Sequence, residues 1–186
     1  MNDYSIALFL HVVGALGFFV ALGLEWTSLR RLRRATTVEQ IREWLRLPDE
    51  MGRVGMASMV MLLAAGFYMM ATVWGGVAWI IVTLGALVPM IILGMVITGR
   101  RMAAIGRMVN TERGPLSPTL HRLLGHPLLW ISIQTRVAIA LGIVFLMTVK
   151  PDLSGSLLAI GVATVLGLAS ALPIRGRERV QEETVA

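Results

Sequence analysis

Residues 77–98 read VAWIIVTLGALVPMIILGMVIT, a run of 22 residues that contains no charged side chain. A helix of about 20 mostly apolar residues is long enough to cross the roughly 30 Å hydrocarbon core of a bilayer. A soluble domain of ordinary composition is about 45–50% apolar and about 25% charged. This chain is 56% hydrophobic and 15% charged over its 186 residues. The sequence therefore predicts an integral membrane protein.

Five stretches of the chain are long and apolar enough to span a bilayer. They lie at 4–24, 54–74, 77–98, 128–149 and 153–173. Backbone polar groups find no water inside the bilayer, so helices and closed barrels are the structures that cross it. Barrel strands would give alternating segments of about ten residues, which the sequence does not show. We therefore expect an all-α membrane helix bundle at 1–174, with five transmembrane helices, followed by a tail at 175–186.

Basic residues fall almost entirely on one side of these spans. Seven arginines lie within 25–53, five within 99–127 and three after Pro173, whereas the opposite side carries Lys150 alone. The positive-inside rule then places the N-terminus outside and the C-terminus in the cytoplasm, as an odd number of spans requires. We expect a multi-pass protein of a bacterial-type cytoplasmic (inner) membrane. The net charge of +6 is explained by this placement and does not indicate a nucleic-acid partner.

The first cytoplasmic loop predicts a short amphipathic helix at about 37–47. Thr36 and Glu39 have the spacing of a capping box, and Pro48 would end the helix. Its apolar stripe consists of Val38, Ile41, Trp44 and Leu45. We expect this helix to lie on the inner leaflet, with its arginines toward anionic lipid, and docking on a partner protein is the alternative.

The remaining connections are short or marked by proline. Gly75-Gly76 and 150–152 predict tight turns on the outer side. Ser117-Pro118 predicts the start of a helix in the cytoplasmic connection. Pro89, inside the third span, should kink it.

Ionisable side chains within the spans are the best candidates for function, because Arg at a membrane helix centre costs at least about 2.5–3.5 kcal/mol. His11 lies in the first span and shares a helical face with Gly14 and with Glu25, at the inner edge of that span. A neutral imidazole can ligate haem iron or a metal ion, or relay protons. A histidine hydrogen-bonded to a neighbouring helix, with a structural role only, is the other interpretation.

Arg136 is the second such residue, in the fourth span beside Ser132, Gln134 and Thr135. One interpretation is a structural ion pair between Arg136 and Glu25. The other is an anion site, in which the guanidinium grips a haem propionate or an acidic substrate with two hydrogen bonds.

Other residue patterns carry weaker signals. His121 and His126 are expected to be solvated loop histidines. The 12 methionines are expected to be apolar filler, although thioethers also suit Cu(I). Small residues recur every four positions along the fifth span, at Gly155, Ala159, Ala163, Gly167 and Ala171. This pattern favours close helix packing, either within the chain, in a homo-oligomer or with a partner membrane subunit.

Short motifs in the first four spans resemble known membrane families. The first helix reads Leu10-His11-Val12-Val13-Gly14-Ala15, which resembles the copper-resistance protein D group and the four-helix bacterial protoporphyrinogen oxidases. Ala65-Gly66-Phe67-Tyr68, and Arg136 followed by residues 146–151, look like a related integral membrane family of unknown function.

The resemblance has different implications for its two branches. In the oxidase branch, His11 would correspond to a first-helix histidine that is associated with haem. That branch also uses a lysine on its third helix, which 77–98 lacks, so protoporphyrinogen oxidation is disfavoured. The copper branch would imply metal uptake or tolerance.

These observations lead to one leading hypothesis and two alternatives. The leading one is a protein that binds haem b or copper between the first and fourth helices, for redox or metal handling. His11 would be the axial or metal ligand and Arg136 the anion partner. The alternatives are a cofactor-free accessory or scaffold subunit and a small-molecule or ion permease. Known catalytic motifs such as the P-loop or HExxH are missing, so no enzyme class is assigned.

Overall fold

The computed structural model describes residues 2–170, and the side chains of 46–51 are not included in that description. The described part is all-helical, as predicted, and contains no β-strand. Its helices are α1 (Asp3–Leu32), α2 (Val38–Met69), η1 (Met70–Trp74), α3 (Ala78–Ile91), η2 (Ile92–Gly99), α4 (Arg100–Thr111), α5 (Pro118–Gly125), α6 (Pro127–Val149) and α7 (Leu153–Ala169), of which η1 and η2 are π-helical.

Four helical segments are long and apolar enough to cross a membrane. They are Asp3–Leu32, Gly52–Trp74, Ala78–Thr111 and Pro118–Val149. Helix α7 is also apolar, with 17 residues in the described part of the chain. The prediction of a membrane helix bundle is confirmed to this extent, and the fifth span stays a prediction. The tail at 175–186 lies outside the described residues.

Two of these helices run beyond the predicted spans into the basic loops. Helix α1 continues to Leu32, and the third apolar helix continues through η2 and α4 to Thr111. Arg and Leu are good helix formers, so nothing in these sequences ends the helix at the expected bilayer boundary. Arg30 and Arg31 lie in the last turn of α1, where cations interact favourably with the helix dipole.

Helix α2 is continuous from Val38 to Met69, so the helix end predicted at Pro48 is wrong. A proline inside a helix removes one hydrogen bond and costs about 3 kcal/mol. Residues on both sides of it are nevertheless packed, because Val38 and Ile41 are 0% exposed and the later turns of α2 contact α1. Packing on both sides holds the helix through the proline.

The cap of α2 differs from the predicted box by one residue. Thr37 is the N-cap residue and accepts a hydrogen bond from the Gln40 N–H at 3.4 Å. The Gln40 side chain accepts in return from the Thr36 N–H at 2.9 Å. Glu39, which was expected to close the box, accepts instead from the Gly114 N–H at 3.2 Å.

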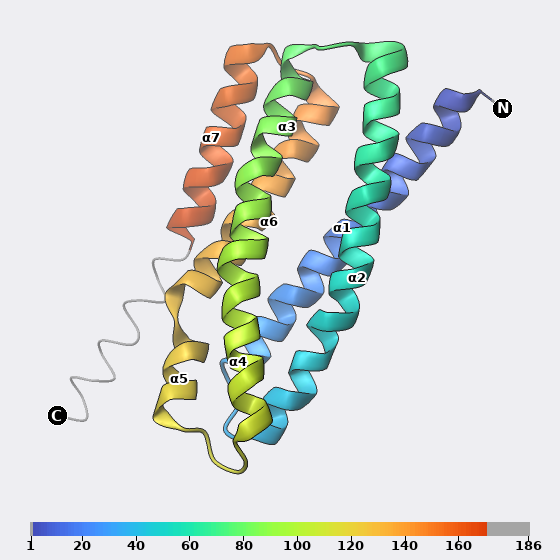
Figure 1. Cartoon of the computed structure of the whole chain (residues 1–186). Helices are drawn as coiled ribbons and strands as arrows, with labels where there is room; N and C mark the ends of the chain where they lie inside the picture. The colour runs from blue at the N-terminus through green and yellow to red at the C-terminus, as the bar shows by residue number, and fades with distance from the viewer. Residues whose placement is uncertain (1, 171–186) are drawn as a thin grey trace. The chain divides into compact units, whose positions relative to one another are not determined.

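The chain divides into two compact units. The first consists of Met1–Val77 and Val109–Leu116, and the second of Ala78–Met108 and Ser117–Ala186. In the first unit, α1 and α2 run antiparallel and cross one another (Figure 1). In the second unit, α6 contacts α3, η2 and α7.

The start of α2 is fastened to the segment 109–116 of the first unit. The Val38 N–H donates to the Gly114 carbonyl at 3.0 Å. The Arg42 guanidinium donates to the carbonyls of Val109 at 2.7 Å and Glu112 at 3.5 Å, at the end of α4. Since Val38 and Ile41 are fully buried in protein, the expectation that this apolar stripe lies on the lipid leaflet is wrong for them.

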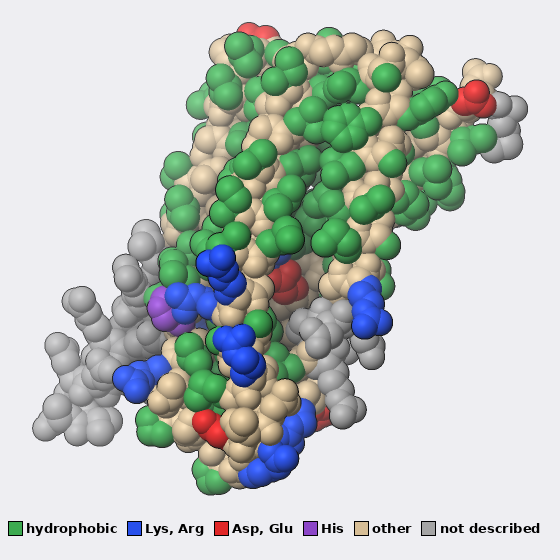
Figure 2. All heavy atoms as spheres, viewed as in Figure 1, with side chains coloured by type: hydrophobic (Ala, Val, Ile, Leu, Met, Phe, Trp, Pro, Cys, Tyr) green, Lys and Arg blue, Asp and Glu red, His purple; other side chains and the backbone are tan. Residues whose placement is uncertain are grey.

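Apolar side chains cover the outside of the second unit along its membrane helices. Leu158 and Val165 of α7 are 69% and 63% exposed. Hydrophobic side chains likewise cover the visible face of α3 and η2, whereas basic side chains gather over α4 (Figure 2). Exposed apolar surface of this extent is expected where lipid is the solvent.

The short turns form where the sequence predicted them. Gly75 has a positive φ of 64° after η1, a conformation that suits glycine. Lys150 also has a positive φ, 53°, and the Asp152 side chain caps α7 by accepting from the Gly155 N–H. Ser117 caps α5, which begins at Pro118 as expected.

Candidate functional site

Small residues bring α1 and α2 into close contact. A Cβ added to Gly14 would lie 2.9 Å from two backbone atoms of α2, the Leu62 nitrogen and the Ser58 oxygen. A Cβ on Gly17 would collide with the Ser58 hydroxyl oxygen. The two backbones therefore approach each other as small residues allow in membrane helix pairs.

His11 lies on this same contact, half-buried, and is bound to the backbone of α2. Its Nδ1 lies 3.0 Å from the carbonyl oxygen of Leu62. A carbonyl can only accept, so Nδ1 carries the hydrogen of this bond. In the neutral ring, Nε2 then keeps its lone pair and can act as a ligand or as a proton acceptor.

Gly66 fixes the position of the His11 ring from one turn further along α2. A Cβ at residue 66 would lie 3.2 Å from Cε1 and 3.3 Å from Nδ1 of the imidazole. A larger residue would push against the ring, so Gly66 and the Leu62 carbonyl together determine how His11 is oriented. The structure contains the hydrogen bond to a neighbouring helix that the structural interpretation of His11 expected, and the role of His11 stays a prediction.

This hydrogen bond is also the arrangement that ligating histidines use. A histidine that binds a metal commonly donates its other ring N–H to a carboxylate or a backbone carbonyl, which fixes the tautomer and the ring orientation. His11 has this bond through Nδ1. The hydrogen bond from Nδ1 is therefore compatible with either interpretation of His11.

Arg136 lies in the second unit, on α6, and is 8% exposed. Its side chain passes over Gly94 in η2, where a Cβ would lie 3.0 Å from Nη1 and 3.6 Å from Cδ. Because residue 94 is a glycine, the Arg136 side chain has room to lie against the backbone of η2. The π-helical segment begins three residues after Pro89, and the kink predicted at Pro89 stays a prediction.

Two buried hydroxyls lie on the same contact between α6 and η2. Ser132, one turn before Arg136, donates to the Leu93 carbonyl at 2.9 Å. The Thr98 hydroxyl, 2.9 Å away, then donates to the Ser132 oxygen. Thr98 and Gly94 were not predicted as site residues, since an isolated threonine or glycine in an apolar run gives no signal of its own.

The predicted site residues belong to different units. His11 and Glu25 lie in the first unit, on α1, and Arg136 lies in the second. The ion pair between Glu25 and Arg136, and a ligand site shared by His11 and Arg136, therefore stay predictions.

The stripe of small residues on α7 packs against α6 of the same chain. A Cβ on Gly142 of α6 would lie 3.0 Å from the Cβ of Ala163 and 3.9 Å from the carbonyl oxygen of Ala159. Gly167 approaches the α6 backbone at Thr135. Gly155 belongs to the first turn of α7, where its N–H donates to Asp152 at 2.8 Å. Ala171 lies outside the described residues.

The two histidines of the predicted cytoplasmic connection, His121 and His126, differ in their exposure to solvent. His121 is exposed on α5, as expected. His126 lies in the connection between α5 and α6, as expected, but it is only partly exposed and its side chain caps α6, a role that was not predicted. The pair His126-Pro127 could have predicted this helix start, because proline is frequent at the first position of a helix.

Within residues 2–170, no group of three or more His, Cys, Asp and Glu side chains gathers in a way that could hold a metal ion. A scan of protein-family models, a search of curated proteins and a search of solved structures found no match to this chain.

Proposed function

We propose that this chain is a five-span protein of a bacterial-type cytoplasmic membrane that binds a b-type haem or a metal ion through His11, in redox chemistry or metal handling. The observation that carries the proposal is the 3.0 Å contact between His11 Nδ1 and the Leu62 carbonyl. It assigns the ring hydrogen to Nδ1 and leaves Nε2 as the ligand atom.

The membrane part of the proposal is supported by apolar helices and by the placement of charge. Four described helices meet the length and composition of a span, and α7 would supply the fifth together with the residues that follow it. The arginines lie in alternate connections between the spans and in the C-terminal tail. This placement favours an N-terminus outside and a C-terminal tail in the cytoplasm.

The donor set at His11 suits haem better than a bare copper ion. The porphyrin itself supplies four iron ligands, so one imidazole is a sufficient protein donor. A copper ion would take all of its ligands from the protein or from water. A bound haem would supply one-electron redox chemistry.

The test is a reduced-minus-oxidised visible spectrum of detergent-purified protein from cells replete in haem and copper, with elemental analysis of the same sample. We expect a haem band, or stoichiometric copper, in the wild type and its loss in His11→Ala. The matched control is His121→Ala, which removes an exposed histidine and should keep the signal. A colourless, metal-free wild type would overturn the proposal, as would full cofactor content in His11→Ala.

A second variant separates loss of the ligand from loss of the fold. Gly66→Ala places a methyl group 3.2 Å from the His11 ring and leaves the imidazole present. We expect it to retain the cofactor with a shifted absorption band or a lower content. Added imidazole should restore part of the signal to His11→Ala if that variant is folded. An unchanged spectrum in Gly66→Ala would argue against ligation through this ring orientation.

A further inference from the structure

A single residue, His126, separates α5 from α6. Helix α5 ends at Gly125 and α6 begins at Pro127, and His126 between them has an extended backbone with φ of −63° and ψ of 124°. Pro127 has no N–H, so Leu128 carries the first N–H of α6 that needs a partner. That N–H donates to the His126 Nδ1 at 3.3 Å.

The imidazole can fill this role only while it is neutral. An accepting Nδ1 must be bare, so the ring hydrogen is on Nε2. In the imidazolium both nitrogens are donors, and the hydrogen bond from Leu128 is lost. The added charge would also stand at the N-terminus of α6, where the helix dipole disfavours cations.

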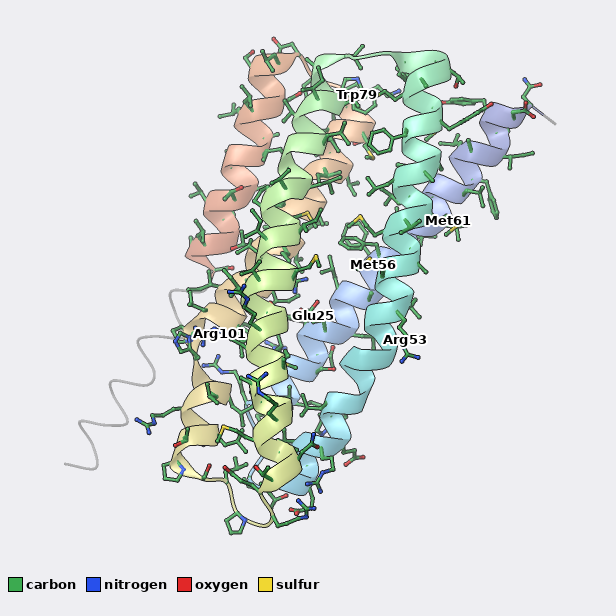
Figure 3. All side chains as sticks on the ribbon, in the orientation of Figure 1. Glu25, Arg53, Met56, Met61, Trp79 and Arg101 are labelled. Atoms are coloured by element: carbon green, nitrogen blue, oxygen red, sulfur yellow. The ribbon has the colours of Figure 1, made fainter. Side chains whose placement is uncertain are left out.

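The surroundings of His126 add to this dependence on protonation. Arg101 of α4 extends toward the junction of α5 and α6 (Figure 3), and its charge repels a proton on the ring. On α5, His121 is exposed and Arg122 donates back to the Pro118 carbonyl. Burial, and then the charge of Arg101, lower the pKa of His126 below its ordinary value of 6.5.

We propose that His126 is a pH-sensitive cap that keeps the first turn of α6 closed while its ring is neutral and lets it open when the ring is protonated. This turn carries Leu129 and Trp130, which are 4% and 7% exposed, so its opening would expose apolar side chains. Helix α6 is also the helix that holds Ser132 and Arg136.

The direction of the pH effect follows from the sign of the shift. A base with a lowered pKa in the folded state binds fewer protons there than in the unfolded state, so stability rises with pH. The contribution of the cap is complete above the ordinary value of 6.5 and is lost as the pH falls below it toward the folded pKa.

The test is hydrogen exchange of the full chain in lipid nanodiscs, read as protection factors of the amides at 128–131 between about pH 8 and about pH 5. We expect protection of these amides to fall about fivefold in acid, the size of effect that a lost N-cap produces. His126→Asn provides a cap acceptor that does not titrate, and its protection should be the same at both pH values. Arg101→Gln should move the transition to higher pH.

His121→Asn is the matched control, because it removes a nearby exposed histidine and should keep the wild-type transition. Protection that does not change with pH in the wild type would overturn the proposal. The same acid loss in His126→Asn would also overturn it, because another group would then be responsible.

Discussion

The Cα atom of Thr135 on α6 lies 2.6 Å from the point where a Cβ on Gly167 of α7 would stand. Both residues are buried, and the Cβ of Ala138 would be 3.1 Å away on the same face. Because the nearest atom belongs to the backbone, a side-chain rotation cannot relieve the contact. The two helices are therefore in backbone contact at this point, and Gly167 is needed for packing within the chain.

Gly167→Ala should lower the thermal unfolding midpoint of the purified protein. An extra methyl group in a packed core typically costs about 1–3 kcal/mol. Gly161 is the matched control on the same helix, because nothing lies within 4 Å of its Cβ position. Gly161→Ala should be neutral or stabilising, since Ala is favoured over Gly in a helix by about 0.5–1 kcal/mol. Equal midpoints for the two variants would contradict this packing.

A second glycine pair tests the contact between α1 and α2. Gly14→Ala would place a methyl group 2.9 Å from the backbone of α2, whereas a Cβ on Gly23 has nothing within 4 Å. We expect Gly14→Ala to destabilise by about 1–3 kcal/mol and Gly23→Ala to be tolerated. Thermal unfolding in one detergent gives the comparison. If Gly14→Ala proves as stable as the wild type, the helices do not cross at Ser58 and Leu62.

Ser132→Ala should destabilise the second unit, because two groups that form hydrogen bonds with the Ser132 hydroxyl would lose their partner. The Leu93 carbonyl would lose its donor, and the Thr98 hydroxyl, 6% exposed, would lose its acceptor. An unsatisfied buried polar group costs about 1–3 kcal/mol. Adding Thr98→Val should cost little more or recover part of the loss, because the stranded hydroxyl is then removed. Fully additive losses in this double-mutant cycle would show that the two hydroxyls are not coupled.

Thr148→Ala is the control for Ser132→Ala on the same helix. The Thr148 hydroxyl is exposed and donates to the carbonyls of Val144 and Phe145 in its own helix. Its removal should change the unfolding free energy by less than about 0.5 kcal/mol, as surface substitutions usually do.

The helices were predictable because length and apolar composition decide them. A run such as 77–98 has no charged residue, and α3 and η2 occupy it. Where local signals competed with packing, sequence reasoning failed. Pro48 favours a helix end and the stripe at Val38 and Ile41 favours a lipid surface, yet contacts with distant residues of the chain decide both.

The ionisable residues of the candidate site were predictable from the sequence, but the groups that orient them were not. His11 and Arg136 are recognisable because an ionisable side chain in an apolar run is costly. The groups that orient them carry no such signal. The Leu62 carbonyl is a main-chain atom, and Gly66 and Gly94 matter for the side chains they lack, so only the register of the helix pairs reveals them.

Glu39 provides a test of the contact between the start of α2 and the segment 109–116. Hydrogen bonds from its own backbone N–H and from Gly114 lower the pKa of the Glu39 carboxyl below its ordinary value of 4.5. An acid with a lowered folded pKa stabilises above its ordinary value, and the effect is lost as the pH falls through the folded pKa.

We therefore expect exchange of the Gly114 amide to accelerate as the pH falls below 4.5, after correction for the intrinsic rate. Glu39→Gln keeps an acceptor for the Gly114 N–H and does not titrate, so its protection should vary little over the same range. The Val38 amide, which donates to the Gly114 carbonyl, is the internal reference for opening of the whole segment. If both amides lose protection together in the wild type and in Glu39→Gln alike, acid opens the segment without any contribution from the carboxylate.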